Sequence, residues 1–431
     1  MSQNIILGAV LAVASIGVVS TVALWSPVVA VALLGLLVFA GGVVWAVRQQ
    51  FLWSLLSLCF VPRIALILVD SRVGLLPVPP IVSGHNHRAI LVANAWRSGD
   101  FLRYVTEFGS MRRLVAHALA PFYILFGNSM LAGRVGVASF SILVGYLVYR
   151  MTLQFATKQR ALMATALTLM WPSVLARSII IQRETILMAA LLAFLLTLVK
   201  WIDENSWRMA PVAVVSLVAI YMLREENLLL LFAAVVVALL VKGSQARRYL
   251  GFAVIFAVPA SLYLVANSGL LLPHNTGFTV EALNRFAHAR AHGDAAYLVN
   301  LWYKNWFDIV LYLPIKVCYL LFSPFPWQVH GLVKWFAGIS GWGLLAAIVL
   351  SRGGTIRAAN SSKAVFALLA FLVVGVAAYA IIEMNYAAAF RRRVQFVPLI
   401  LIFATVALPE VRIRIRDSTG DTNSGDALAE K

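Results

Sequence analysis

Residues 363–410 read KAVFALLAFLVVGVAAYAIIEMNYAAAFRRRVQFVPLILIFATVALPE, so that two strongly apolar segments flank three consecutive arginines. Apolar segments of about 20 residues are long enough to cross a bilayer core of about 30 Å as helices. Such segments recur along the chain, which has 431 residues, 62% of them hydrophobic and only 12% charged. No soluble domain of this length needs that much apolar surface. The sequence therefore predicts an all-α, polytopic membrane protein.

About twelve membrane-spanning helices are predicted from these segments. They lie near 4–24, 27–47, 51–70, 129–150, 161–180, 182–200, 209–223, 227–242, 249–268, 329–350, 363–384 and 394–410. We divide the chain into two extra amino-terminal helices (1–50), a main membrane domain (51–410) and a polar tail (411–431) that is predicted to be disordered. The first 24 residues lack a basic n-region and are interpreted as a retained helix rather than a cleaved signal peptide.

The net charge of +18 is carried mainly by short loops between apolar segments. This distribution disfavours a nucleic-acid partner and instead indicates a positive-inside orientation with contacts to anionic lipid headgroups. Both termini are then expected in the cytoplasm of a multi-pass cell-membrane protein, with 71–128 and 269–328 as long outer loops. The arginine triplet at 391–393 falls on the outer side, against the rule that the other short loops follow. Whether 113–127 and 300–325 cross the membrane stays open.

The carboxylates gather near one predicted face. In this topology ten of the 17 acidic residues lie on or near the outer side. These ten are Asp70, Asp100, Glu107, Glu184, Glu225, Glu226, Glu281, Asp294, Asp308 and Glu383. Ionisable groups near membrane depth are costly and usually mark a functional cavity, although outer loops also need charge for solubility. The clustering favours one outward-facing polar site.

The outer segment 71–128 is predicted to contain two helices of its own. Three prolines at 77, 79 and 80 prevent the preceding span from continuing. HNHRAILVANAW (85–96) and MRRLVAHALAPFYILFG (111–127) then have helical composition with basic residues at the edge, as helices in the membrane interface do.

The order of LVDSRVG, HNHRAILVANAW, APFYILFGNSMLAGRVGVASFSILVGYLVYR and SIIIQRETILMAALLAFLL resembles the C-superfamily of membrane glycosyltransferases, and within it the protein-mannosyltransferase-like branch. The resemblance covers roughly 51–410. It implies transfer of a sugar from a polyprenyl-phosphate carrier to an acceptor on the outer side, in polysaccharide biosynthesis or a related pathway. Such a reaction needs a base for the acceptor hydroxyl and cations for the departing phosphate.

The acidic motif of that family is degenerate here. An Asp or Asp-Glu pair is expected at 83–87, where this chain has SGHNH. Asp70 is the nearest carboxylate and the first choice for the catalytic base, Asp100 is the second, and His87 or His85 are alternatives because imidazole titrates near neutrality. Two histidines at i and i+2 do not share a helix face, so no metal site is predicted from them.

Cationic and polar side chains near the outer ends of the helices are the predicted substrate-binding residues. They are Arg88, Arg183, Glu184, Arg224, Lys304, Arg391, Arg392 and Arg393. At least one arginine of the triplet is expected to face a cavity and clamp the carrier phosphate, with Glu383 or Glu184 holding its orientation. The planar guanidinium suits this task because it donates two hydrogen bonds at once.

Two other functions stay open. One is a non-catalytic, polymerase, ligase or flippase-type component of polysaccharide assembly, which the degenerate acidic motif favours. The other is a secondary transporter, against which stand the lack of an internal repeat and the position of the carboxylates. No cofactor is predicted, a divalent metal stays open, and the sequence leaves the oligomeric state, the sugar and the acceptor undetermined. The expected partners are a polyprenyl-phosphate-linked sugar and membrane lipids.

Overall fold

The computed structural model of the protein describes residues 18–23, 26–47, 50–74, 80–105, 107, 110–242, 279–329 and 331–409. Within them the regular structure is helical, apart from one isolated bridge, which confirms the all-α prediction. The α-helices are α2 (Pro27–Val47), α3 (Phe51–Val73), α4 (Pro80–Arg97), α5 (Ser110–Phe126), α6 (Met130–Thr152), α7 (Lys158–Met170), α8 (Pro172–Ser178), α9 (Glu184–Glu204), α10 (Ala210–Arg224), α11 (Asn227–Lys242), α13 (Val280–His288), α14 (Trp306–Phe322), α15 (Leu332–Ser361), α16 (Val365–Ile382), α17 (Tyr386–Arg393) and α18 (Val397–Ala407).

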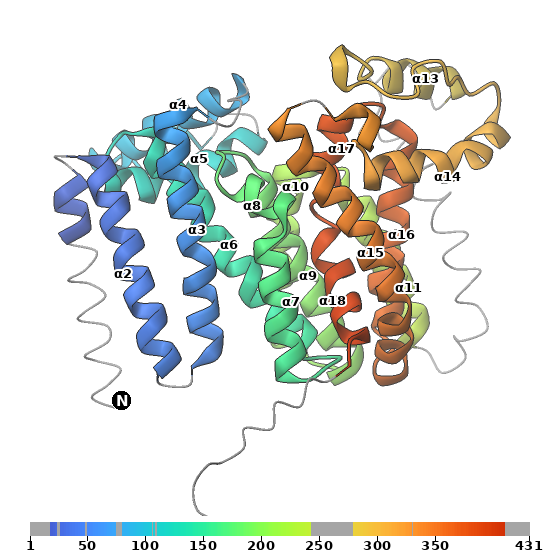
Figure 1. Cartoon of the computed structure of the whole chain (residues 1–431), viewed down its shortest axis with the longest axis horizontal. Coiled ribbons are helices and arrows are strands. Elements are labelled where there is room, and N and C mark those ends of the chain that lie inside the picture. Colours follow the sequence, from blue (N-terminus) through green and yellow to red (C-terminus); the bar gives the residue numbers. More distant parts are fainter. Residues whose placement is uncertain are drawn as a thin grey trace, which may run out of the picture.

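Helices long and apolar enough to cross a membrane make up much of this bundle. Six described helices meet that condition, namely α2, α3, α6, α9, α15 and α16, and α5, α10, α11 and α18 are shorter apolar helices. In Figure 1 the long helices lie side by side and run roughly along one direction, with α15 tilted against its neighbours. The polytopic prediction is confirmed. The predicted span 249–268, most of the span 4–24 and the tail 411–431 lie outside the described residues.

The predicted single span at 161–180 is wrong, because the chain breaks into α7 and α8 at Trp171. Its backbone is extended, with φ −61° and ψ 130°, as the ring of a following proline requires. Arg63 of α3 reaches this break and donates to the carbonyl oxygen of Leu169 at 2.6 Å and to that of Cys59 at 2.6 Å. A fully buried guanidinium thereby satisfies a carbonyl group at the end of α7, which has no water to bond to inside an apolar bundle.

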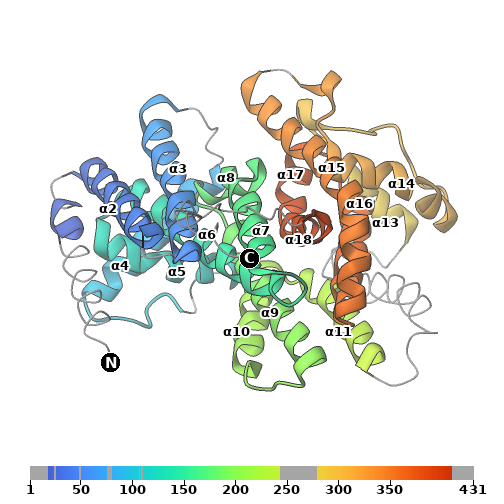
Figure 2. The same ribbon diagram turned by 60° about the horizontal axis from the view of Figure 1, so that its bottom comes forward.

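Close backbone contact holds the carboxyl-terminal part of the bundle together. Figure 2 shows α15, α16 and α18 on one side and α2 to α6 on the other, with α7 and α9 between them. At Gly354 of α15, an added Cβ would lie 1.6 Å from the carbonyl oxygen of Phe403 in α18. Only glycine permits this approach, in line with the use of small residues where membrane helices pack.

The helices of both predicted outer loops gather at one end of the bundle, the upper end in Figure 1, together with α17. They are α4 and α5 from the first loop, and α13 and α14 from the second. Backbone contacts join the second loop to the segment before α17: the Tyr297 amide donates to the carbonyl of Met384 at 2.9 Å, and Ala296 forms an antiparallel bridge with Asn385. Residues nearly 90 positions apart in the chain therefore share one wall of the space below them.

Candidate functional site

A cavity of about 320 Å³ lies at this end of the bundle, within the size range of small-molecule sites. Its lining is mostly charged or polar and comes from α4, α9, α10, α17 and the segments beside them. The lining residues are His85, Gln182, Arg183, Glu184, Arg224, Arg290, His292, Ala295, Glu383, Asn385, Ala387, Ala388, Arg391 and Arg392. Five arginines against two glutamates make the cavity strongly cationic.

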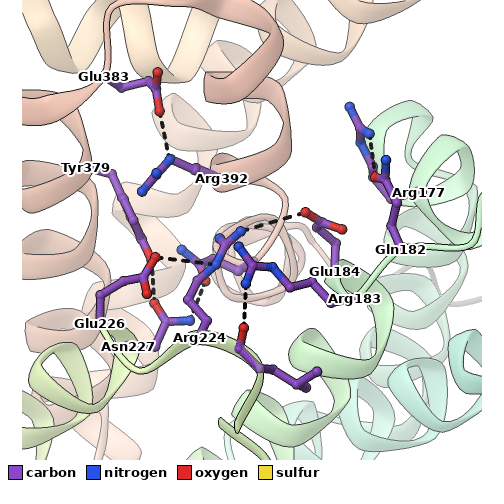
Figure 3. Close-up of polar contacts among 12 residues, drawn as sticks. Arg177, Gln182, Arg183, Glu184, Arg224, Glu226, Asn227, Tyr379, Glu383 and Arg392 are labelled. Atoms are coloured by element: carbon purple, nitrogen blue, oxygen red, sulfur yellow. Dashed lines mark hydrogen bonds and ion pairs between the residues drawn. The ribbon is translucent and has the colours of Figure 1, made fainter. Parts of the chain in front are cut away.

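One cluster of charged side chains in the cavity lies where α9 begins and α10 ends. Glu184 is the first residue of α9 and Arg224 the last of α10, and Arg224 Nη2 lies 3.7 Å from Glu184 Oε1. Arg224 Nε is also 3.7 Å from Glu226 Oε1. Arg183 donates from Nη1 to the carbonyl oxygen of Leu223 at 2.6 Å, next to the end of α10 (Figure 3). The ends of two apolar helices thus bring four charged side chains to one place.

The short helix α17 supplies a second charged group. The side chain of Asn385 caps this helix by accepting from the amides of Ala387 at 3.0 Å and Ala388 at 3.3 Å. Successive side chains of a helix point about 100° apart, so the three arginines that end α17 must point in different directions. Arg391 and Arg392 line the cavity, and Arg392 Nε contacts Glu383 Oε2 at 2.7 Å.

Arg393, the third arginine of the triplet, lies elsewhere than Arg391 and Arg392. Its side chain is fully buried and does not line the cavity. Its guanidinium donates to the carbonyl oxygens of Leu321 at 2.7 Å, Ser323 at 2.5 Å and Ala337 at 3.0 Å. These carbonyls belong to the last turn of α14, the residue after it and the early part of α15, so Arg393 ties three segments together.

A buried aromatic ring connects the two charged groups. The centre of the Tyr379 ring lies 4.7 Å from Cζ of Arg392 and 6.0 Å from Cζ of Arg224, within the range of cation–π contacts. The Tyr379 hydroxyl donates to Asn227 Oδ1 at 2.7 Å, and Asn227 Nδ2 donates to Gln395 Oε1 at 2.9 Å (Figure 3). Because Tyr379, Asn227 and Gln395 are buried, these hydrogen bonds fix the ring beneath both arginines.

The loop after α13 closes the cavity from the other side. Arg290 Cζ lies 3.9 Å from the centre of the Phe286 ring, and the side chain of Asn385 donates to the carbonyl of His292 at 3.1 Å. Burial and the nearby positive charge of Arg392 lower the pKa of Arg290 from 12.5 to about 10. Burial and the charge of Arg224 likewise lower the pKa of Arg183. The cavity therefore holds like charges that repel one another.

The predicted catalytic residues lie outside this cavity. Asp70 is buried, and its Oδ2 lies 2.6 Å from Arg134 Nη1 of α6, so that its carboxylate serves an interhelical ion pair. Asp100 is exposed in the turn after α4, and His87 is exposed on α4. His85, the alternative base, is buried and lines the cavity. The α3 helix thus directs Asp70 to α6 rather than to the cavity.

The predicted binding residues divide in two. Those that line the cavity are Arg183, Glu184, Arg224, Arg391 and Arg392. Those that do not are Arg88, Lys304 and Arg393. Lys304 is exposed in the turn before α14, where its backbone amide donates to Asp308 Oδ2 at 2.7 Å.

Gln182, Arg290, His292 and Asn385 also line the cavity and were not predicted. Arg290 and His292 follow α13 in an irregular segment, so no periodicity marks them. Asn385 carries a local signal, since an asparagine directly before YAAAF is a good helix cap. Its second contact, with the distant His292, depends on the tertiary fold.

We also searched the described residues for side chains that could together bind a metal ion. No group of three or more His, Cys, Asp or Glu side chains suited to a metal ion occurs among the described residues. The cavity itself offers mainly guanidinium groups, which repel cations. The arrangement is suited to binding an anion.

Comparison with known proteins gives one family. No curated protein and no solved structure matches the chain. Residues 114–268, about a third of the chain, match the family described as dolichyl-phosphate-mannose-protein mannosyltransferase. The match includes Gln182, Arg183, Glu184 and Arg224 of the cavity. Over this segment the chain is similar to the protein-mannosyltransferase family of membrane glycosyltransferases, and the resemblance predicted from the sequence is confirmed.

Proposed function

We propose that the protein is a membrane glycosyltransferase that moves a sugar from a polyprenyl-phosphate carrier to a glycan, lipid or protein acceptor at the outer face of the cell membrane. The observation that carries the proposal is the cavity with five arginines at the end of an apolar helical bundle. A phosphate joined to a prenyl chain needs both parts, cations for its head and an apolar surface for its tail. The similarity of residues 114–268 to a family of sugar transferases supports the same reading.

The arginines have a chemical task in such a reaction. When the bond between the sugar and the phosphate oxygen breaks, negative charge develops on the phosphate, and guanidinium groups held in place stabilise it. Glu383 orients Arg392, and Glu184 with Glu226 orients Arg224, so that the donors are in position before the carrier binds. Because each of these glutamates contacts an arginine, none of them is an obvious base.

His85 is proposed as the proton acceptor for the acceptor hydroxyl. It lines the cavity, whereas Asp70, Asp100 and His87 do not. A neutral imidazole accepts a proton near pH 7 and suits general-base catalysis. This assignment replaces the carboxylate that the related family uses.

The alternative is a non-catalytic or polymerase, ligase or flippase-type component of polysaccharide assembly. Two observations favour it: both carboxylates of the cavity contact arginines, and the usual acidic motif reads SGHNH here. Such a protein would bind the carrier without transferring its sugar.

Binding and turnover distinguish these functions. Purified full-length protein in lipid nanodiscs is screened against polyprenyl-phosphate sugars, first for saturable binding and then for release of polyprenyl phosphate with added acceptors. The proposal expects binding by the wild type and its loss in Arg391→Gln and Arg392→Gln, with Lys304→Gln as an unaffected control. Binding without sugar release would support the alternative. No binding, or binding that the cavity variants leave unchanged, would refute both.

A further inference from the structure

Two polar atoms from neighbouring residues of the cavity lining have no hydrogen-bond partner among the described residues. They are Nε2 of Gln182 and Oε2 of Glu184. Both side chains line the cavity, and both residues are almost completely buried, at 3% and 5% exposure. Buried polar atoms are costly when they are unpaired. An unpaired donor and an unpaired acceptor in one cavity therefore point to a ligand that satisfies both.

The amide of Gln182 is held in one orientation by Arg177 of α8. Nη1 of Arg177 donates to Oε1 of Gln182 at 2.8 Å, as Figure 3 shows. A guanidinium group can only donate, so the atom that it contacts must be the amide oxygen, and the hydrogens of Nε2 stay available. Arg177 is itself packed against the buried Phe390 ring, whose centre lies 5.0 Å from its Cζ. Gln182 therefore offers a ligand a donor and not an acceptor.

The carboxylate of Glu184 uses one oxygen for a contact within the protein and keeps the other. Oε1 lies 3.7 Å from Nη2 of Arg224, whereas Oε2 has no hydrogen-bond partner among the described residues. A carboxylate can only accept hydrogen bonds. Glu184 is the first residue of α9 and Gln182 lies in the bend before it, so the backbone keeps the donor and the acceptor near each other. The last torsion of both side chains is broad, so a small rotation brings each group to a ligand in the cavity.

This pair of groups suits a hydroxyl better than a phosphate. A phosphate oxygen would accept from Gln182, but its negative charge would be repelled by the carboxylate of Glu184. A hydroxyl satisfies both residues, because its oxygen accepts from the amide while its hydrogen is donated to the carboxylate. The pair therefore differs in its chemistry from the arginines of the cavity, which are suited to an anion.

We propose that Gln182 and Glu184 together bind a hydroxyl group of the sugar on the donor and thereby contribute to the choice of sugar. The inference rests on the proposed function and adds the residues that recognise the transferred sugar. The sugar is joined directly to the phosphate, so the residues that bind it must adjoin the phosphate-binding arginines. Glu184 meets this condition, because the carboxylate that offers Oε2 contacts Arg224 through Oε1. An acceptor hydroxyl has the same chemistry, and donor binding measured without an acceptor separates the two sources.

Farnesyl phosphate esters of mannose, glucose, galactose and arabinose test the inference beside cyclohexyl farnesyl phosphate. The cyclohexyl probe has the same charge and a ring of similar size, but no hydroxyl group. Binding to the full-length protein in nanodiscs is measured by calorimetry without an acceptor. We expect at least one sugar ester to bind about tenfold more tightly than the cyclohexyl probe, the scale of one charged hydrogen bond. Gln182→Met, which removes the donor and keeps the length of the side chain, should bring this ratio of affinities close to one.

Three further variants control the result. Gln182→Glu keeps the contact with Arg177 and removes both N–H donors, so it should lower the ratio even if Gln182→Met fails to fold. Glu184→Gln should lower it too, because the amide oxygen takes the contact with Arg224 and leaves an amide nitrogen where Oε2 accepted. The ratio cancels any effect of these changes on the phosphate, which both probes share. Gln154→Met, the same change in the turn after α6 and outside the cavity, should leave the ratio unchanged.

Three results overturn the inference in distinguishable ways. Equal binding of the sugar esters and the cyclohexyl probe would show that the pair does not bind the donor sugar, and would leave the proposed function standing. A rise in the KM of the acceptor in Gln182→Met would then assign the pair to an acceptor hydroxyl. A preference for sugar that Gln182→Met reduces no more than Gln154→Met would place sugar recognition elsewhere. Failure of every probe to bind would remove the proposed function as well.

Discussion

The carboxylate of Glu383 and the guanidinium of Arg392 form an ion pair, with Oε2 and Nε 2.7 Å apart. Glu383 directly follows the last residue of α16, and Arg392 lies in the last turn of α17, so the pair fixes the angle between the two helices. The contact uses only Nε, and Nη1 keeps its hydrogens for a ligand. The ion pair thus holds Arg392 in the lining of the cavity.

Arg392→Lys should weaken binding of the lipid-phosphate donor by on the order of tenfold, about 1.4 kcal/mol, the scale of one charged hydrogen bond. Lysine keeps the charge but cannot hold Glu383 and a phosphate at once with a planar fork. Donor titration of both proteins in nanodiscs measures the effect. Equal affinities would mean that the triplet serves only as an anchor to lipid headgroups.

Arg393→Lys should lower the thermal stability of the protein while donor affinity changes little. Its guanidinium holds three carbonyl groups in α14, the residue after it and α15, and the single ammonium group cannot reach all of them. Thermal unfolding in detergent, followed beside donor titration, separates the two effects. A loss of affinity at unchanged stability would return Arg393 to the binding site.

Glu383→Gln should destabilise the protein, by roughly 3 kcal/mol, because it leaves the largely buried charge of Arg392 without its partner. The double variant Glu383→Gln with Arg392→Gln should recover part of that loss, since no uncompensated charge remains. A double-mutant cycle on unfolding measures the coupling. Additive losses would mean that the ion pair contributes nothing to the fold.

His85→Gln should abolish sugar transfer and leave donor affinity nearly intact, because the amide keeps polar contacts but accepts no proton at neutral pH. Asp70→Asn should instead lower stability, by roughly 3 kcal/mol, since it breaks the buried pair with Arg134. Turnover, donor binding and unfolding are measured on both variants. Full turnover in His85→Gln, with none in a folded Asp70→Asn, would restore Asp70 as the base.

Single cysteines at Ser83 and Ser361 test the orientation, because both residues are exposed and lie in regions predicted on opposite sides of the membrane. A membrane-impermeant maleimide added to intact cells should label the cysteine at 83 and not the one at 361. The two native cysteines, Cys59 and Cys318, are first replaced by alanine. Labelling at 361 from outside would reverse the proposed topology.

The length of the apolar segments was sufficient to predict the architecture but not the direction of every side chain. Apolar segments of about 20 residues predicted the helices, since a segment of that length can cross a bilayer. The break at Trp171 was missed even though Pro172 marks it, because the surrounding composition stays apolar. The two helices of the first loop were predicted from the prolines before them and the composition within them.

The site was predictable where charge alone marks it. Arginine and glutamate at the ends of apolar helices stand out, and five such residues line the cavity. Whether a charged residue faces the cavity also depends on its position around the helix, which composition does not give. Arg393 and Asp70 have the right residue type at the right depth, yet one faces α14 and α15 and the other faces α6. Arg290 and His292 reach the cavity through contacts between their loop and the segment before α17, which no local pattern encodes.

The Tyr379 ring beneath Arg392 and Arg224 has a consequence for how the cavity responds to its ligand. Its hydroxyl is held by Asn227, which in turn is held by Gln395, so neither the ring nor the guanidinium groups above it are free to swing apart. The repulsion between like charges is overcome while the chain folds rather than when the ligand arrives. An arriving anion relieves that repulsion, so occupancy should raise the melting temperature of the whole bundle. Relief of this electrostatic repulsion contributes to the affinity for an anion, in addition to the hydrogen bonds that the anion forms.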